Sequence, residues 1–246
     1  MERVAVILTN FNMPERADAL GDHLARYAAW PHDFYCVDNG SNLAPPSAYT
    51  NVQLLANAQT TAGWLAGVDR ARLEGGYLGY LFLITSAEFV GESDPIAPLA
   101  QLLLDDPSAV GVHAALTPDS TTHWEHLKTR GGDRPRRTWM IDNICALYRS
   151  DWFDANNPFD PALPYAWGVD LEAGYKARSQ GRSLWVHEGV HVRKVTDIGY
   201  RMGRMGMSAR ERQQKAGDNM RAVLSGRYGN NWYSRMVEEH VNGSMR

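Results

Sequence analysis

The chain has 246 residues, of which 44% are hydrophobic and 10% aromatic, so it can build a sizeable core and is not disordered as a whole. Its formal net charge of −3 excludes a global electrostatic attraction to nucleic acid or to a membrane surface, and such a partner would need a local patch. The two cysteines, Cys36 and Cys145, lie far apart and lack the CxxC spacing of zinc and redox sites. We expect both to be buried thiols of a protein in a reducing compartment.

Two apolar runs bear on location. Residues 4–8 form a run shorter than the apolar region of a signal peptide, and the later run at residues 80–84 is too short to span a bilayer. These features lead us to expect a cytoplasmic protein.

Over the first half of the chain, short runs rich in β-forming residues alternate with segments of helical periodicity. This alternation is typical of βαβ units, so we predict an α/β fold with a mainly parallel, Rossmann-like sheet flanked by helices. Strands are expected at residues 4–9, 34–37, 52–55, 80–84 and 109–115. Helices are expected from Pro14 to Tyr27, at 61–73 and at 96–104.

From residue 117 to 137 the pattern stops, and a polar, basic segment follows. It carries Lys128, Arg130, Arg134, Arg136 and Arg137. A long segment of this kind inside a compact domain is either a functional lid or a surface loop, and both interpretations stay open.

The second half of the chain is predicted to resume with a strand at 140–148, a helix at 169–180 and one or two short strands at 184–192. Residues from 208 onward have a helical pattern with a break at 229–231. We therefore expect one domain at 1–200 and a helical extension at 201–246 packed on it. The basic stretch at 193–227 is either a solvated helix face or a contact for a polyanion.

Polar residues follow four of the predicted strands. They are Thr9 to Asn12, Asp38 to Ser41, Asn57 with Gly63, and Thr85 to Glu88. Each block alone could be an ordinary turn, helix start or packing position. In an open parallel sheet, however, ligands bind at the carboxyl ends of the strands, so the joint placement predicts a ligand pocket.

These blocks resemble the GT-A-fold glycosyltransferases of family 2. The resemblance extends from residue 4 to about residue 194 and is carried by residues 6–12 with 14–16, by 37–41, by 57–63, by 80–84, and by Trp167-Gly168-Val169-Asp170-Leu171 with Arg178 and Gly181. It implies transfer of a sugar from a nucleoside-diphosphate sugar, a UDP-sugar by default, to an acceptor hydroxyl with inversion. The acceptor is left open between a glycan and a nucleic-acid base or phosphorylated carrier.

The resemblance also implies roles for individual residues. Asp38 would receive the base or ribose, and Gly63 would let the backbone approach the nucleotide. The expected donor-nucleotide residues are Thr9, Asn10, Asn12, Asp38, Asn39, Gly63 and Ser86. Asp170 would be the general base, although an Asp at the start of a helix can also be its N-cap. Trp167 would lie in the acceptor site.

The sequence departs from the family pattern where a metal would bind. The family places Asp-x-Asp after its fourth strand to hold Mn²⁺ or Mg²⁺, but here that register is Thr85-Ser86-Ala87. Glu88 follows one residue later, and strand alternation would point it the other way. The family's second metal ligand aligns as well with Lys194 as with His191.

Two interpretations follow from this departure. In one, Glu88 and His191 still bind Mn²⁺ or Mg²⁺. In the other, which we favour, Lys194 with Arg193 neutralises the leaving diphosphate without a metal. A protein of another class, a catalytically silent module that binds nucleotide sugars or glycans, is the alternative to an enzyme. A nucleotidyltransferase is disfavoured, because no Gly-rich phosphate loop with an activating lysine is present.

Overall fold

In the computed structural model, residues 2–196, 207–238 and 240 are described, and the expected boundary at 200/201 lies outside them. The strands are β1 Arg3–Asn10, β2 His32–Asn39, β3 Thr50–Leu54, β4 Tyr77–Ile84, β5 Ala87–Phe89, β6 Ala109–Leu116, β7 Arg136–Thr138, β8 Cys145–Arg149 and β9 Ser183–Lys194. The α-helices are α1 Pro14–Tyr27, α2 Gln59–Glu74, α3 Ala97–Asp105, α4 Ser150–Asn156, α5 Val169–Ser179 and α6 Ala209–Tyr228. Shorter turns are the 3₁₀ helix η1 Glu125–Leu127 and the π-helical turn η2 Ser234–Glu238.

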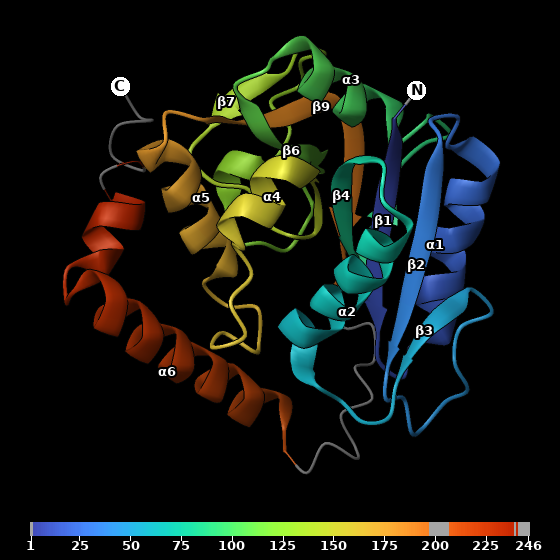
Figure 1. The fold of residues 1–246 in the computed structure, drawn as a ribbon, viewed down its shortest axis with the longest axis horizontal. Coiled ribbons are helices and arrows are strands. Elements are labelled where there is room, and N and C mark those ends of the chain that lie inside the picture. Colours follow the sequence, from blue (N-terminus) through green and yellow to red (C-terminus); the bar gives the residue numbers. More distant parts are fainter. Residues whose placement is uncertain (1, 197–206, 239, 241–246) are drawn as a thin grey trace.

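The strands form one central sheet in the order β3-β2-β1-β4-β8-β6-β9-β5, with β7 paired to β9 (Figure 1). The pairings among β1, β2, β3 and β4 are parallel, as expected. β8 is antiparallel to both β4 and β6, so the sheet also contains antiparallel pairings. The chain from β6 to β8 contains no α-helix to carry it back across the sheet in the parallel sense.

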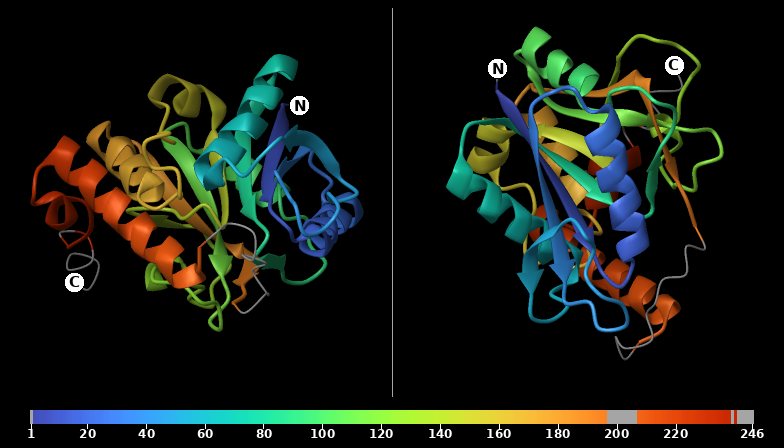
Figure 2. Two further views of the ribbon diagram at one scale, coloured as in Figure 1. Left: turned by 90° about the horizontal axis from the view of Figure 1, so that it is seen from below. Right: turned by 90° about the vertical axis from the view of Figure 1, so that its right-hand side faces the viewer.

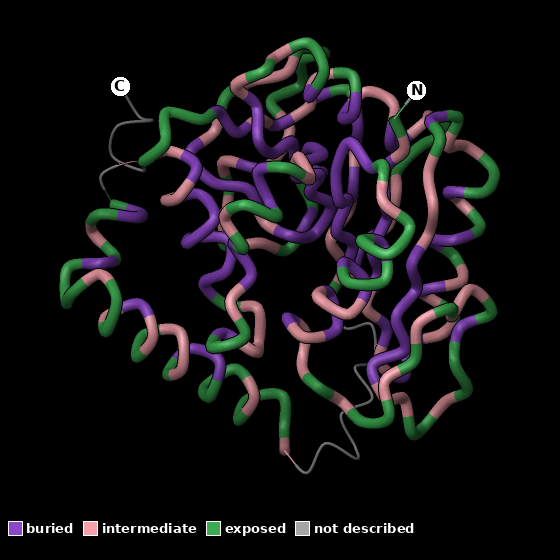
Figure 3. Tube along the Cα trace, viewed as in Figure 1, coloured by how far each residue is buried: buried purple, intermediate pink, exposed green. Residues whose placement is uncertain are grey.

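Helices cover both faces of this sheet because β1 alternates two sets of buried apolar residues. Val4, Val6 and Leu8 pack in a core with residues of α1 and α3. Ala5 and Ile7 pack on the other face with residues of α2, α4 and α5. Burial is accordingly continuous along the central strands (Figure 3). The α/β fold class and the flanking helices are thus confirmed, and both cysteines are buried and unpaired.

The C-terminal helix α6 lies along α5 rather than on the sheet (Figure 2). A third apolar cluster joins them and contains Leu171 of α5, Leu224 of α6, Trp232 before η2 and Met236 within η2. None of the helices in the described ranges is long and apolar enough to cross a membrane.

Two expected strands have other bounds in the structure. The strand expected at 140–148 begins only at Cys145, and the one or two short strands expected at 184–192 form the single strand β9. The register between β6 and β9 shifts between His187 and His191. This irregularity interrupts the sequence periodicity of β9 but does not end the strand.

The segment at 117–137 is anchored to β9. Glu188 is buried and accepts hydrogen bonds from Arg136 Nε at 2.6 Å and from Thr129 Oγ1 at 2.6 Å. The guanidinium of Arg137 lies over the Trp185 ring. Two of the five basic residues, Arg136 and Arg137, therefore contact β9. Lys128 pairs with Glu125 at 3.0 Å, and Arg130 and Arg134 are exposed.

Candidate active site

The polar blocks predicted to follow the strands meet at one edge of the sheet. β1, β2 and β4 are parallel, and their carboxyl ends lie at the lower edge in Figure 1. Asn10 is the register partner of Asp38, and Thr9 is the partner of Ile84. Neighbouring strands lie about 5 Å apart, so Thr9, Asn10, Asp38 and the residues after Ile84 form one polar rim.

The turn between β1 and α1 is built by asparagine side chains. Asn10 Oδ1 accepts a hydrogen bond from Met13 N at 3.1 Å, which starts α1 without a conventional cap. Asn12 has a φ of 59° and accepts hydrogen bonds from Asn42 N and Leu43 N, both at 2.8 Å. The expected nucleotide residue Asn12 thus holds the loop after β2 in place.

Two other expected nucleotide residues have structural duties. The nitrogen and the oxygen of the Asn39 side-chain amide both bind the backbone at the start of α2. Nδ2 donates to Gln59 O at 3.1 Å, and Oδ1 accepts from Ala58 N at 2.9 Å. A Cβ on Gly63 would lie 2.5 Å from Thr9 Cγ2, so Gly63 lets α2 pack closely on β1. Gly63 thus has a packing role, and its expected role of letting the backbone approach the nucleotide stays a prediction.

Several buried polar atoms at this edge have no hydrogen-bond partner among the described residues. They are Thr9 Oγ1, Asn10 Nδ2, Asp38 Oδ1, Ser86 Oγ and Asn143 Oδ1. More than nine in ten buried polar groups in folded proteins are satisfied, so a cluster of exceptions at one place needs an explanation. A polar ligand at the carboxyl ends of the strands would supply the missing partners.

Asp170 lies in the first turn of α5 and is buried. The N-cap of α5 is Gly168, with a φ of 90°, so the alternative that Asp170 caps this helix is wrong. Burial, and next the negative charge of Asp142, raise the pKa of Asp170 to about 7, although backbone N–H groups of α5 oppose the shift. Its carboxylate is therefore a base of near-neutral strength.

Two further acidic groups, Asp142 and Tyr148, interact electrostatically with Asp170, and neither was expected from the sequence. Burial raises the pKa of Asp142, and the positive charge of Lys194 opposes that shift. Burial, with the charges of Asp170 and Asp142, raises the pKa of the Tyr148 phenol. No motif marks either residue, because they reach the site only through the antiparallel insertion of β8 beside β4.

Lys194 and the position after β4 face each other across the β5–β9 pair. Lys194 is the register partner of Ala87, and Val195 N donates to Ser86 O at 2.9 Å. Glu88 is the register partner of Arg193 instead. The backbone of Lys194 is thus paired with Ala87, next to the position where the resemblance to family 2 leads one to expect metal-binding carboxylates.

Glu88 is engaged elsewhere. Its carboxylate pairs with Arg16 at 2.8 Å and with Arg193 at 3.9 Å, and Arg193 also pairs with Asp119 at 2.9 Å. No group of three or more His, Cys, Asp or Glu side chains suited to a metal gathers in the described part of the chain. In this arrangement the Glu88 carboxylate is already paired with two arginines, and the expectation that it binds a metal with His191 stays a prediction.

The loop before α5 is anchored from two sides. Thr61 N in the first turn of α2 donates to Pro164 O at 3.1 Å, and Asn219 of α6 donates to Ala162 O at 3.1 Å. Within the loop Ala166 has a φ of 66°, an unfavourable conformation for a residue with a side chain. The next residue, Trp167, is 40% exposed and precedes Asp170 by three residues in the sequence.

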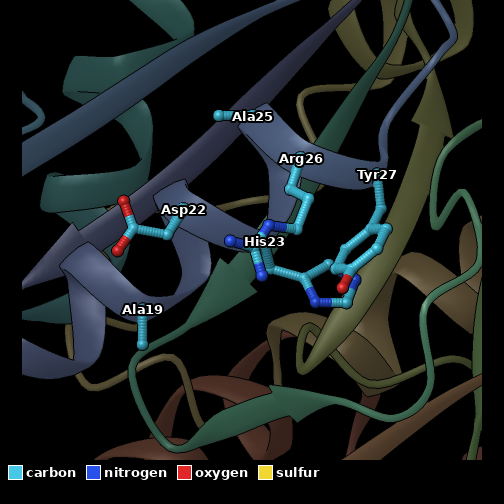
Figure 4. Close-up of a pocket in the computed structure, with 6 residues that line it drawn as sticks. All are labelled: Ala19, Asp22, His23, Ala25, Arg26 and Tyr27. Atoms are coloured by element: carbon cyan, nitrogen blue, oxygen red, sulfur yellow. The ribbon is translucent and has the colours of Figure 1, made fainter.

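A hollow on the outer side of α1 lies away from this edge (Figure 4). It is lined by Ala19, Asp22, His23, Ala25, Arg26 and Tyr27, all from the same helix. A single helix face cannot enclose a ligand, so we place the site at the strand ends.

No family model and no curated protein matches the chain in sequence. Among solved structures the chain is similar to GalNAc-T7, crystallised with UDP, GalNAc and Mn²⁺, with a TM-score of 0.67 and 12% identity over 95% of this chain and 51% of that one. It is also similar to the mannosyltransferase PcManGT of Pyrobaculum calidifontis, in complex with GDP-Man and Mn²⁺, with a TM-score of 0.58 and 13% identity over 98% of this chain and 75% of that one. The chain spans about half the length of GalNAc-T7, and the two likenesses show that it has the GT-A fold.

Proposed function

We propose that this GT-A-fold chain is a glycosyltransferase that moves a sugar from a nucleoside-diphosphate sugar, a UDP-sugar by default, to an acceptor hydroxyl with inversion. The observation that carries the proposal is the set of buried, unpartnered polar atoms at the carboxyl ends of β1, β2 and β4. The buried carboxyl of Asp170 in the first turn of α5 adds a candidate base. The two solved structures support it, because each was determined with a nucleotide or nucleotide sugar.

Asp38 is the residue we assign to the base or ribose of the donor. Its Oδ2 accepts a hydrogen bond from Ser41 N at 3.2 Å, which orients the carboxylate, while Oδ1 has no partner among the described residues. A carboxylate oxygen held in this way accepts a hydrogen bond from a ribose hydroxyl or from a uracil N–H. Thr9 and Ser86 add hydroxyl groups on the neighbouring strand ends.

Asp170 is the residue we assign as general base. Its carboxylate would take the proton of the acceptor hydroxyl while the hydroxyl oxygen attacks the anomeric carbon and the nucleoside diphosphate leaves from the opposite side. A base with a pKa of about 7 is strong enough to accept the proton and is still largely ionised slightly above neutral pH. The exposed ring of Trp167 would stack on the acceptor.

The leaving diphosphate gains a negative charge that something must stabilise. We assign this role to Lys194, because its strand position faces Ala87 directly and because Glu88 is paired with Arg16. A lysine ammonium donates charge-assisted hydrogen bonds to phosphate oxygens and needs no further ligand. Catalysis is thereby proposed to be metal-independent, and Arg193 would be a secondary cation.

The first test is a thermal-shift panel of nucleoside diphosphates and nucleotide sugars, each with Mn²⁺, with Mg²⁺ and with EDTA. A ligand that binds the folded state raises the melting temperature, and we expect one nucleoside diphosphate to do so equally in EDTA. The selected donor is then tested for slow hydrolysis, which needs no acceptor. Failure of every nucleotide to bind would refute the proposal, whereas binding without any hydrolysis or transfer would point to a silent binding module.

A further inference from the structure

Arg16 lies in the first turn of α1, shortly after the carboxyl end of β1. Its Nε donates a hydrogen bond to the carbonyl oxygen of Thr85 at 3.2 Å. Thr85 is the first residue after β4, and the residue before it, Ile84, is the register partner of Thr9. The guanidinium of Arg16 therefore lies at the strand ends where the buried, unpartnered polar atoms gather.

Two of the three guanidinium nitrogens of Arg16 have partners, and the third has none. Besides the contact of Nε, Nη1 donates to Glu88 Oε1 at 2.8 Å. Nη2 is buried and has no hydrogen-bond partner among the described residues. Nε and Nη2 share one edge of the planar guanidinium, so their N–H groups on that edge point in the same direction. On this edge Nη2 therefore points to the side of Thr85 and not toward Glu88.

The ion pair with Glu88 does not by itself explain this arrangement. The side chain of Arg16 is 25% exposed and that of Glu88 is 38% exposed, and ion pairs open to solvent contribute little to stability. The pair needs only Nη1, whereas a buried N–H group without an acceptor costs free energy. Ser86, which follows Thr85, adds a buried hydroxyl that also lacks a partner among the described residues. A ligand group that accepts several hydrogen bonds would satisfy both.

The chemistry of these donors favours a phosphate. An edge of a guanidinium matches the spacing of phosphate oxygens, and its hydrogen bonds to an anion are stronger than those between neutral groups. Lys194 of β9 is the register partner of Ala87, which lies between Ser86 and Glu88. Cationic residues from α1 and from β9 therefore flank the stretch that follows β4.

We propose that Arg16 is a further donor-binding residue: Nη2 of its guanidinium donates hydrogen bonds to a phosphate oxygen of the nucleoside diphosphate. The inference rests on the proposed function, since the diphosphate takes its place in the site from it. Glu88 and the Thr85 carbonyl fix the guanidinium before the ligand binds, so little side-chain freedom is lost on binding. Arg16 is thus a cation for the diphosphate in addition to Lys194, supplied by another element of the fold.

Calorimetric titration with UDP and with uridine tests the contact, in the buffer of the thermal-shift panel that gives the strongest binding. Another nucleoside diphosphate and its nucleoside replace them if the panel selects one. Arg16→Ala is expected to lower the affinity for UDP about tenfold, the loss of one charge-assisted hydrogen bond, and to leave the affinity for uridine unchanged. Inorganic pyrophosphate, which carries phosphates without a nucleoside, should displace UDP from the wild-type protein and do so about tenfold less well from Arg16→Ala.

Two further variants make the test specific. Arg3→Ala removes an arginine from the opposite end of β1, where it pairs with Asp33 at 2.7 Å, and should leave the affinity for UDP unchanged. Arg16→Gln keeps an amide donor at the end of its side chain but carries no charge, and it should show the same selective loss as Arg16→Ala. If Arg16→Ala does not fold, Arg16→Gln takes its place in the comparison.

The outcomes separate this inference from the proposed function. A wild-type protein that binds no nucleoside diphosphate refutes the function. A wild-type protein that binds UDP, with Arg16 variants whose affinity for UDP is unchanged, refutes the inference alone. Equal losses of affinity for UDP and for uridine would also refute the inference, because they would show that Arg16 supports the fold and does not bind the phosphates.

Discussion

Arg227, near the end of α6, holds the buried carboxylate of Glu172 on α5 with two hydrogen bonds, from Nη1 to Oε1 at 2.9 Å and to Oε2 at 3.0 Å. The same guanidinium pairs with Asp160 in the loop before α5, and Tyr228 OH donates to Glu172 Oε1 at 2.7 Å. Glu172 lies two residues after Asp170. The C-terminal helix therefore fixes both the helix that carries the proposed base and the loop that carries Trp167.

Removing this cation should destabilise the fold. We expect Arg227→Ala to lower the free energy of unfolding by about 3–5 kcal/mol, because it leaves Glu172 charged, buried and without its cationic partner. Arg221→Ala removes a cation from an exposed pair on the same helix and should cost no more than about 0.5 kcal/mol. Urea denaturation of the two variants measures the difference, and equal small losses would show that the Glu172 pair is not important for stability.

Asp170→Asn should abolish turnover and yet stabilise the protein at high pH. The pKa of Asp170 is about 7 in the folded chain against an ordinary value of 3.8, so between these values the folded state binds more protons than the unfolded state. The contribution of Asp170 to the free energy of unfolding of the wild-type protein is thus fully present below pH 3.8. It is lost as the pH rises to about 7. The Tm of Asp170→Asn relative to wild type should be clearly higher at pH 8 than at pH 4. A Tm difference independent of pH would contradict the raised pKa.

Lys194→Ala should weaken binding of a diphosphate selectively. We expect the affinity for the nucleoside diphosphate selected in the thermal-shift panel to fall about tenfold, the cost of one charge-assisted hydrogen bond of roughly 1.5 kcal/mol. The affinity for the corresponding nucleoside, which lacks phosphate, should not change. Lys215→Ala, an exposed lysine of α6, is the matched control. Calorimetric titration in EDTA measures both affinities. An equal loss of affinity for the nucleoside and for the nucleoside diphosphate would show that Lys194 does not bind the phosphates.

The same substitution at two helical glycines should have opposite effects. Gly63→Ala places a methyl group 2.5 Å from Thr9 Cγ2, so we expect a loss of about 1–3 kcal/mol and weaker nucleotide binding through displaced Thr9. A Cβ added at Gly226 in α6 would meet no atom within 4 Å, and Gly226→Ala should stabilise by up to about 1 kcal/mol through helix propensity. Thermal denaturation gives both signs, and a stabilised Gly63→Ala would show that α2 can move away from β1.

The sequence by itself determined the elements whose pattern is local. The short apolar run at residues 4–8 predicted the strand β1, and Pro14 predicted the start of α1, because backbone geometry sets these patterns over a few residues. The polar blocks after the strands predicted the edge where the buried, unpartnered atoms gather. Parallel strands must bring their carboxyl ends together, so this part of the site needed no knowledge of the remaining fold.

Only the tertiary structure decided which charged groups meet there. Arg227 and Glu172 are 55 residues apart in the sequence, and Lys194 lies opposite Ala87 because β9 pairs with β5. The same packing places Gly63 against Thr9 and directs the Asn39 side chain to the backbone at the start of α2. Contacts of this kind depend on strand order and direction, which arise from the burial of the whole chain at once and leave no periodic trace around any single residue.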